Sequence, residues 1–209
     1  IKNNIQVDDL GPVLSFVGKP GNPAAGGIPF AEFMRRQALY RAAEIAATHD
    51  VPEFVKKAQD IYGYAHFVND AAGSLCELED PAVIDLLVEH TLILYVQVTT
   101  AAEEKELIRR AQSDPKPLYF RPAFLAEHMP RYLAERGLPD IAAADPDDFT
   151  RWIFPHLFHA RIPRYAAIAQ PHGYTVTSAE VARIRDEKGF MALMESAIAL
   201  NGVQAIGAL

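Results

Sequence analysis

The sequence predicts an α/β fold in which helices cover a parallel sheet. Three short apolar runs end at turn residues, which is typical of strands buried on both faces of a sheet. Segments of helical length lie between and after these runs, and this alternation favours parallel strands with right-handed crossovers. Hydrophobic residues make up 50% of the chain, enough for a sizeable core. We expect one domain over 1–209, with a sheet-bearing part over 1–120 and a mainly helical extension over 121–209.

The predicted strands are the runs 12–17, 65–68 and 91–98. The first reads PVLSFV and is closed by Gly18, and the second is followed by a polar turn. The third reads TLILYVQV and is dominated by β-branched and aromatic residues, which favour strands.

The predicted helices share helical spacing of apolar residues and capping or proline signals near their ends. They cover 30–48, 52–61, 81–89, 100–112, 122–136, 147–169, 178–187 and 189–200. Pro155 and Pro163 lie inside one of these segments, so we expect that helix to be kinked or split.

The charge balance restricts the class of partner. The chain has 20 Lys+Arg against 27 Asp+Glu, a formal charge of −7, which argues against broad nucleic-acid binding. It leaves room for a local basic pocket that binds a phosphorylated small molecule. The longest apolar stretches are too short to span a bilayer, and no signal peptide is visible, so we expect no membrane partner.

Cys76 is the single cysteine, which excludes a disulfide framework within the chain and any multi-cysteine metal site. We interpret it as a buried packing residue and expect a reducing, cytoplasmic setting. Ile1 stands where a start methionine would be, which raises the hypothesis that the sequence is a piece of a longer protein.

The loop 18–27, GKPGNPAAGG, follows a predicted strand and precedes a predicted helix. Phosphate-binding loops lie at such places because backbone N–H groups and a helix N-terminus attract anions. It is not a Walker A sequence, because Pro20 follows Lys19 and the glycine spacing differs. Two interpretations stay open: a mobile surface loop or lid, or a substrate-facing loop in which Lys19 contacts an anion.

The segment 69–74 follows the second predicted strand, where ligands bind in doubly wound sheets. Asp70 there can orient a hydroxyl nucleophile or hold Mg²⁺, and Gly73 and Ser74 can form the turn that binds the acceptor. The alternative is an ordinary turn, since Asn, Asp and Gly are common turn residues.

Arginines and a lysine after the third predicted strand form a candidate phosphate clamp. Arg109 and Arg110 lie on the predicted helix 100–112, and Lys116 follows in the next loop. Arginines on a lid can hold a transferring phosphoryl group in a bidentate fork. The alternative is a pair of exposed arginines at a helix end.

Three histidines provide a weaker hypothesis. His156 and His159 are three residues apart on a predicted helix and, with His128, could ligate a metal. Surrounding aromatic residues favour partly buried histidines instead, and our prediction includes no metal site in the protein itself. Separately, aromatic side chains of the segment 149–174 could bind a partner or a second copy of the chain.

These segments together resemble the shikimate-kinase-like branch of P-loop phosphotransferases and are similar to a group of uncharacterised bacterial proteins described as ATPases. The resemblance rests on four segments that together span much of residues 5–120. They are FMRRQALYRAAE at 33–44, FVNDAAGSL at 67–75, LILYVQV at 92–98 and AAEEKELIRRAQSDPKPLY at 101–119. The family's Walker A loop is absent from the sequence.

The resemblance implies a three-layer, parallel-sheet P-loop-like domain that uses ATP and Mg²⁺ to phosphorylate a small acceptor or hydrolyse the nucleotide. Within it, Arg41 would anchor the acceptor, Asp9 or its neighbour Asp8 would contact the substrate, and Arg109 or Arg110 would be the lid arginine. The alternative hypothesis is a non-catalytic helical domain for protein interaction or oligomerisation.

Overall fold

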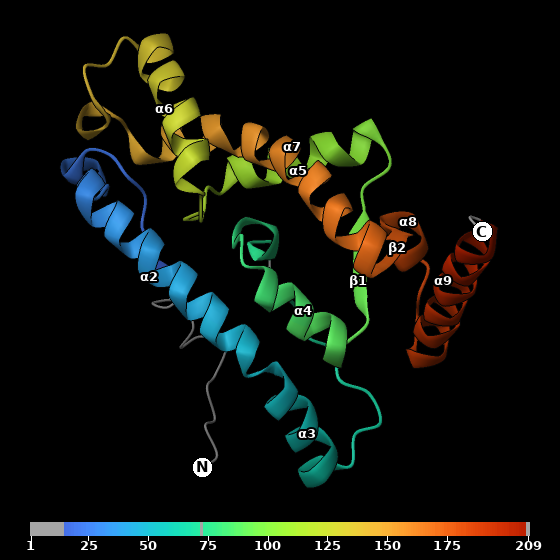
Figure 1. The fold of residues 1–209 in the computed structure, drawn as a ribbon. Helices are drawn as coiled ribbons and strands as arrows, with labels where there is room; N and C mark the ends of the chain where they lie inside the picture. Colours follow the sequence, from blue (N-terminus) through green and yellow to red (C-terminus); the bar gives the residue numbers. More distant parts are fainter. Residues whose placement is uncertain (1–14, 72, 208–209) are drawn as a thin grey trace. The chain divides into compact units, whose positions relative to one another are not determined.

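The computed structural model describes residues 15–71 and 73–207 of the 209-residue chain. Its helices account for most of the described residues (Figure 1). The α-helices are α2 (Phe30–His49), α3 (Val51–Tyr62), α4 (Pro81–His90), α5 (Ala101–Ser113), α6 (Pro122–Arg136), α7 (Pro146–His172), α8 (Ser178–Val181) and α9 (Glu187–Gly207). Short 3₁₀ helices are η2 (Pro23–Ala25), η3 (Leu75–Glu77) and η4 (Ile141–Ala143).

The described sheet has two parallel strands, β1 (Ile93–Gln97) and β2 (Gly173–Thr177). Their register pairs Ile93 with Gly173 and Gln97 with Thr177. The close approach at the start of this ladder requires a glycine, because a Cβ on Gly173 would lie 2.6 Å from the carbonyl oxygen of Ile93.

The predicted three-layer, parallel-sheet α/β fold is therefore wrong: the described residues are 68% helical and form a two-stranded sheet. The run 91–98 does form a strand. Within the run 12–17, residues 15–17 lie in a helical turn and 12–14 are outside the described residues. Residues 65–68 have no regular structure and are exposed. A short apolar run is compatible with a buried strand, a helical segment or an exposed loop. This pattern therefore predicted more strands than the described residues form.

Strand β2 was missed because GYTVT is not a continuous apolar run. Val176 is buried while its threonine neighbours are more accessible, a pattern of alternation rather than of full burial. The β-branched and aromatic content of this segment is the signal that predicts a strand there.

Helix positions follow local capping signals closely. Helix α6 has the predicted bounds and ends where Gly137 adopts φ 63°, the left-handed conformation that glycine favours. Asp80 caps α4 by accepting a hydrogen bond from the Ala82 backbone N–H. Helix α7 continues through Pro155 and Pro163, so it is not split. Ile153 and Leu157, both fully buried, show the packing that offsets the missing backbone hydrogen bonds.

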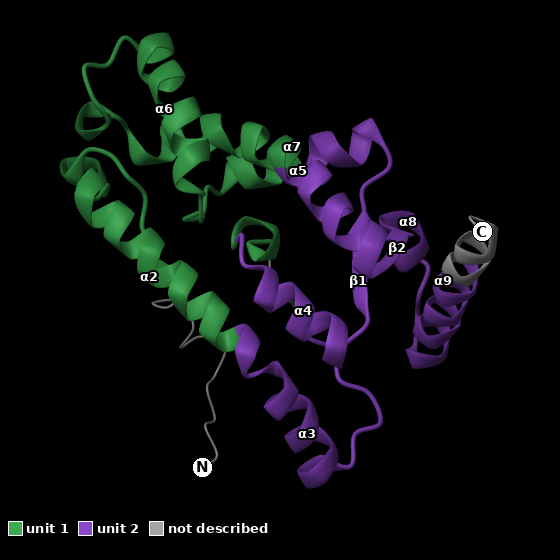
Figure 2. Ribbon diagram, in the orientation of Figure 1, with its two compact units in different colours: residues 1–47, 70–78, 108–160 green, residues 48–69, 79–107, 161–209 purple. Residues whose placement is uncertain are grey.

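The chain divides into two compact units, each assembled from separate stretches of sequence (Figure 2). Unit 1 contains the described residues of 1–47, 70–78 and 108–160, and unit 2 those of 48–69, 79–107 and 161–209.

Unit 1 has an aromatic core. Phe33, Phe120, Phe124, Tyr132 and Phe149 are all at most 3% exposed and belong to one cluster. The Phe120 and Phe124 rings stack with centroids 6.0 Å apart. Such rings bury large apolar areas and dominate the energetics of a core.

Unit 2 is built around the small sheet. Helix α8 contacts both strands, and α9 contacts β2 and α8. Tyr95 of β1 stacks on Tyr165 of α7, with ring centroids 5.6 Å apart. The buried apolar residues of unit 2 are mostly smaller than those of unit 1, such as Val83, Leu87, Ala169 and Val176.

Candidate interaction surface

Large apolar side chains stay exposed on α3 and on the residue that follows its cap. Phe54, Ile61, Tyr62 and Tyr64 are 52%, 65%, 64% and 58% exposed. We call these four residues the α3 face. Phe54 and Ile61 are seven residues apart, close to two helical turns, so they lie on one side of the helix. Several exposed large apolar side chains on one short segment are typical of interaction sites.

The sequence of α3 fixes this arrangement locally. Pro52 lies in the first turn, where its missing N–H costs nothing. Gly63 ends the helix at φ 65°, and its N–H is directed to the carbonyls of Ala58 and Gln59. The Tyr64 N–H then donates to the Ala58 carbonyl at 3.2 Å, which folds the chain back over the helix end.

This cap brings two tyrosines together. The rings of Tyr62 and Tyr64 stack with centroids 5.4 Å apart and an angle of 15° between their planes. A stacked pair of tyrosines offers a broad, rigid contact area with little conformational entropy to lose on binding.

The apolar surface continues along the sequence after Tyr64. Phe67 is 43% exposed and Val68 is 77% exposed. These residues belong to the run 65–68 that we predicted as a buried strand, and all residues from 61 to 70 are exposed. Sequence patterning detected their hydrophobicity correctly and assigned it to the wrong environment.

Charged side chains flank the α3 face. Glu53, Lys57 and Asp60 are exposed and alternate in sign along the helix. Among the described residues, Lys57 and Asp60 have no ion-pair partner. The exposed apolar side is therefore bordered by charges that remain available to a binding partner.

The structure uses two of the predicted substrate residues for hydrogen bonds within unit 1, where Ser74 is buried and Arg41 is half-buried. The Ser74 hydroxyl donates to Oε2 of Glu44 at 3.2 Å and lies 3.2 Å from the Tyr40 hydroxyl. Nε of Arg41 donates to the Leu78 carbonyl at 2.8 Å. Ser74 is 5% exposed. The structure brings Arg41 and Ser74 to the same side of α2, where both join η3 and its neighbours to this helix.

A buried polar network lies beside them, and sequence reasoning missed it. Gln37 donates from Nε2 to the Leu118 carbonyl at 3.0 Å and accepts at Oε1 from the Phe120 N–H at 2.8 Å. Nε of Arg121 donates to the buried Glu77 carboxylate at 2.7 Å. Gln37 follows Phe33 by one helical turn on the buried side of α2. A polar residue in that position is the signal that could have revealed the network.

The loop 18–27 is closed by its own hydrogen bonds. The Ile28 N–H donates to Lys19, and the Gly27 N–H donates to Asn22, each at 2.9 Å. Backbone N–H groups that a phosphate would require are thus used within the loop. Lys19 itself forms an ion pair with Asp147 at the start of α7.

The remaining predicted residues lie at the surface or outside the described residues. Asp70, Gly73, Arg109 and Arg110 are exposed. Asp9 and Asp8 are outside the described residues. Lys116 is exposed and pairs with Asp114 at 2.8 Å.

The segment 109–116, which we predicted to meet 69–74 at a sheet edge, has described contacts with α7. Nε2 of Gln112 donates to the Arg151 carbonyl, and Nε of Arg151 donates to the Gln112 carbonyl, both at 3.0 Å. Residues 74–78, in contrast, contact α2 and Arg121.

The histidines of unit 1 pack among aromatic rings. His128 contacts the Phe124 carbonyl through Nδ1 at 2.9 Å, and its ring lies 5.2 Å from that of His156. Burial lowers the pKa of His156, and the neighbouring His128 acts in the same direction. No group of three or more His, Cys, Asp or Glu side chains among the described residues is placed to hold a metal ion.

The aromatic residues of the segment 149–174 are used within the chain. Trp152 contacts the Tyr132 ring at 5.4 Å between centroids and donates from Nε1 to Glu135 at 2.7 Å. Phe154 and Phe158 are half-buried and contact one another, with centroids 6.3 Å apart. Among the described residues, the large apolar side chains of the α3 face are more exposed than Phe154 and Phe158.

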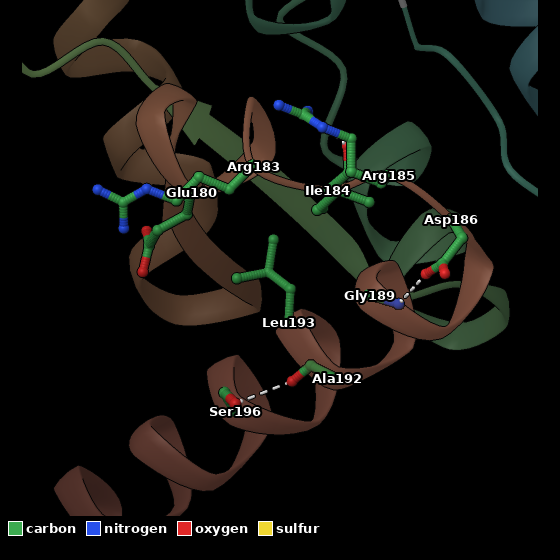
Figure 3. Close-up of a pocket in the computed structure, with 9 residues that line it drawn as sticks. All are labelled: Glu180, Arg183, Ile184, Arg185, Asp186, Gly189, Ala192, Leu193 and Ser196. Carbon is green, nitrogen blue, oxygen red and sulfur yellow. Dashed lines mark hydrogen bonds between the residues drawn. The ribbon is translucent and has the colours of Figure 1, made fainter.

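An open pocket of about 450 Å³ lies in unit 2 between α8, the following loop and α9 (Figure 3). Its polar groups are largely engaged. Glu180 accepts from the N–H and hydroxyl of Thr177, and Asp186 accepts from the Gly189 N–H. The Arg185 guanidinium donates to the carbonyls of Ala182 and Ile184. These bonds stabilise the ends of α8 and α9, so the pocket is a weaker candidate than the α3 face.

Comparison with known proteins gives no independent assignment: no family model, curated protein or solved structure matches the chain. Among the described residues, none of the helices combines the length and apolar character needed to cross a membrane.

Proposed function

We propose that this chain is a non-catalytic, mostly helical protein-interaction domain that binds another polypeptide through the α3 face. The observation that carries this proposal is the exposure of Phe54, Ile61, Tyr62 and Tyr64 on one short segment of unit 2. Water contact with four large apolar side chains is unfavourable, by about 25 cal/mol for each Å² of apolar area. Binding of a partner that covers them recovers this free energy.

The side-chain types support the same proposal. Tyrosine and phenylalanine are enriched at the centres of protein interfaces, where a few buried rings provide most of the binding energy. Charged residues surround the rings on α3, as in interfaces with an apolar centre and a polar rim. The aromatic side chains that we first considered for this role, in the segment 149–174, have partners inside the chain instead.

The test measures, by size-exclusion chromatography, the mass at which the protein elutes from a non-denaturing extract of the cells that produce it. At a chain concentration in the extract above about 100 µM, where a weak assembly stays populated, we expect the tagged wild-type chain to elute above its own mass of 23.1 kDa, and Ile61→Asp to elute at that mass. Leu39→Asp is the matched control, because Leu39 is an exposed leucine, 47% accessible, on α2 of unit 1. Elution of the wild-type chain as a monomer would overturn the proposal.

A second measurement separates this function from the phosphotransferase that the family resemblance implies. A ligand that binds only the folded state raises the melting temperature. We expect ATP with Mg²⁺ to leave the melting temperature of the purified chain unchanged. A saturable increase that is lost in Asp70→Ala or Arg109→Ala would favour the ATP-dependent function.

A further inference from the structure

We infer that the partner bound by the α3 face is a second copy of this chain, and that the two α3 helices pack antiparallel across a two-fold axis. The inference rests on the proposed function and names its partner. Homo-oligomers most often close as two-fold dimers, in which the same surface of both copies is buried. The α3 helix has the features that such a self-complementary surface needs.

The first feature is the order of charges beside the apolar side. Glu53, Lys57 and Asp60 alternate in sign and follow one another at spacings of four and three residues. Reversing the direction of such a row places acids opposite a base. In an antiparallel pair with its two-fold axis level with the Ala58–Gln59 peptide, Lys57 of each copy lies opposite Asp60 of the other.

The second feature is the position of the apolar residues in the same arrangement. Phe54 of one copy is then offset from Ile61 of the other by two residues, about 3 Å along the helix axis. Side chains of this size contact one another over such an offset. The arrangement that pairs the charges therefore also buries the two side chains that lie on the same side of α3.

The third feature is that the two charged side chains are available to form new ion pairs. Lys57 and Asp60 are exposed and have no ion-pair partner among the described residues. Forming the pairs across the axis breaks no existing bridge within the described chain. The antiparallel direction also places the helix dipoles favourably.

The test is sedimentation equilibrium of the purified 209-residue chain and of two charge-reversed variants. An α3 interface is small, so we expect a Kd on the order of 10–100 µM for the wild type. Lys57→Glu places two acids opposite each other, and Asp60→Lys places two lysines opposite each other. Each variant alone should dimerise about tenfold more weakly.

An equimolar mixture of the two variants should recover wild-type affinity, because the acid introduced at position 57 of one copy then faces the base introduced at position 60 of the other. Lys56→Glu, a charge reversal on the side of the helix opposite Phe54, is the control and should leave the Kd within about twofold. Recovery in the mixture supports the inference, since a folding defect would not be complemented. A net-charge effect is distinguished by Asp60→Lys alone, which is less acidic than the wild type and would then dimerise more tightly, not more weakly.

A monomeric wild type at all concentrations, or variants that dimerise as tightly as the wild type, would overturn the inference. If the purified chain is monomeric while the extract contains a larger Ile61-dependent assembly, the second copy is excluded and the proposed function stands with another partner. If neither experiment detects an assembly, the proposed function fails as well.

Discussion

The Glu77 carboxylate, at 1% exposure, accepts a hydrogen bond from Nε of Arg121 at a distance of 2.7 Å. This pair joins η3 to the start of α6 within unit 1. Removing one member of a buried pair leaves an uncompensated charge, so we expect Arg121→Met to lower the free energy of unfolding by about 3 kcal/mol. Urea denaturation measures this change.

The double variant Glu77→Gln/Arg121→Met is the matched control for that prediction. Because it removes the charge of both members, we expect it to be more stable than Arg121→Met alone. A double variant that is less stable than the single one would show that the ion pair is not the interaction that matters.

Gln37 connects α2 to the segment 118–120 through two hydrogen bonds. In Gln37→Leu the Leu118 carbonyl and the buried Phe120 N–H lose their partner. We expect the variant to lose about 2–3 kcal/mol in urea denaturation, because each unsatisfied buried polar group is costly. Gln59→Leu, at an exposed position of α3, should change stability by no more than about 0.5 kcal/mol. Equal losses in the two variants would contradict the buried network.

The closed conformation of the loop 18–27 depends on Gly27. A Cβ at this position would lie 2.5 Å from the carbonyl carbon of Gly21, so the backbone must shift. We expect Gly27→Ala to cost about 1–3 kcal/mol in thermal or urea unfolding. Gly189→Ala in the first turn of α9 meets mainly the Asp186 carboxylate and should be neutral or slightly stabilising. A mobile loop would tolerate both substitutions alike.

Acid should weaken unit 1 through His156. Burial and the neighbouring His128 lower the pKa of His156 below its ordinary value of 6.5 in the folded protein. The unfolded chain therefore binds a proton first as the pH falls, so stability is complete above about pH 6.5 and decreases from there toward the lowered pKa. The groups that act on His156 are His128, Arg131, Glu135 and His159.

The measurement is the free energy of unfolding at several pH values between about 5 and 7.5, a range set by the ordinary histidine pKa. We expect a positive slope below about pH 6.5 in the wild type and a smaller slope in His156→Gln. Carboxylates with lowered pKa values, such as Asp148, contribute at more acidic pH. A wild-type slope that His156→Gln leaves unchanged would contradict this assignment.

Local signals in the sequence predicted much of the secondary structure. Gly63 and Gly137 mark the ends of α3 and α6, and Asp80 marks the start of α4, because caps depend on residues within one turn. The sheet was predicted poorly because strand pairing depends on residues far apart in the chain. Ile93 pairs with Gly173, and neither segment carries information about the other.

The candidate interaction surface, like the fold, could be predicted from the sequence only in part. The hydrophobicity of residues 65–68 was evident from the sequence, but the pattern could not distinguish a buried strand from an exposed binding segment. Ser74 and Arg41 were singled out for chemistry, and the structure uses both for internal hydrogen bonds. Solvent exposure, which identifies the α3 face, becomes visible only after the chain is folded.

The most direct test of binding through the α3 face is photo-cross-linking in the cells that produce the protein. A benzophenone amino acid replaces Phe54 in one version and Leu39 of α2, the exposed control, in another. We expect irradiation to give one reproducible polypeptide adduct from position 54 and none from position 39. Absence of an adduct from position 54, or the same adducts from both positions, would contradict the account.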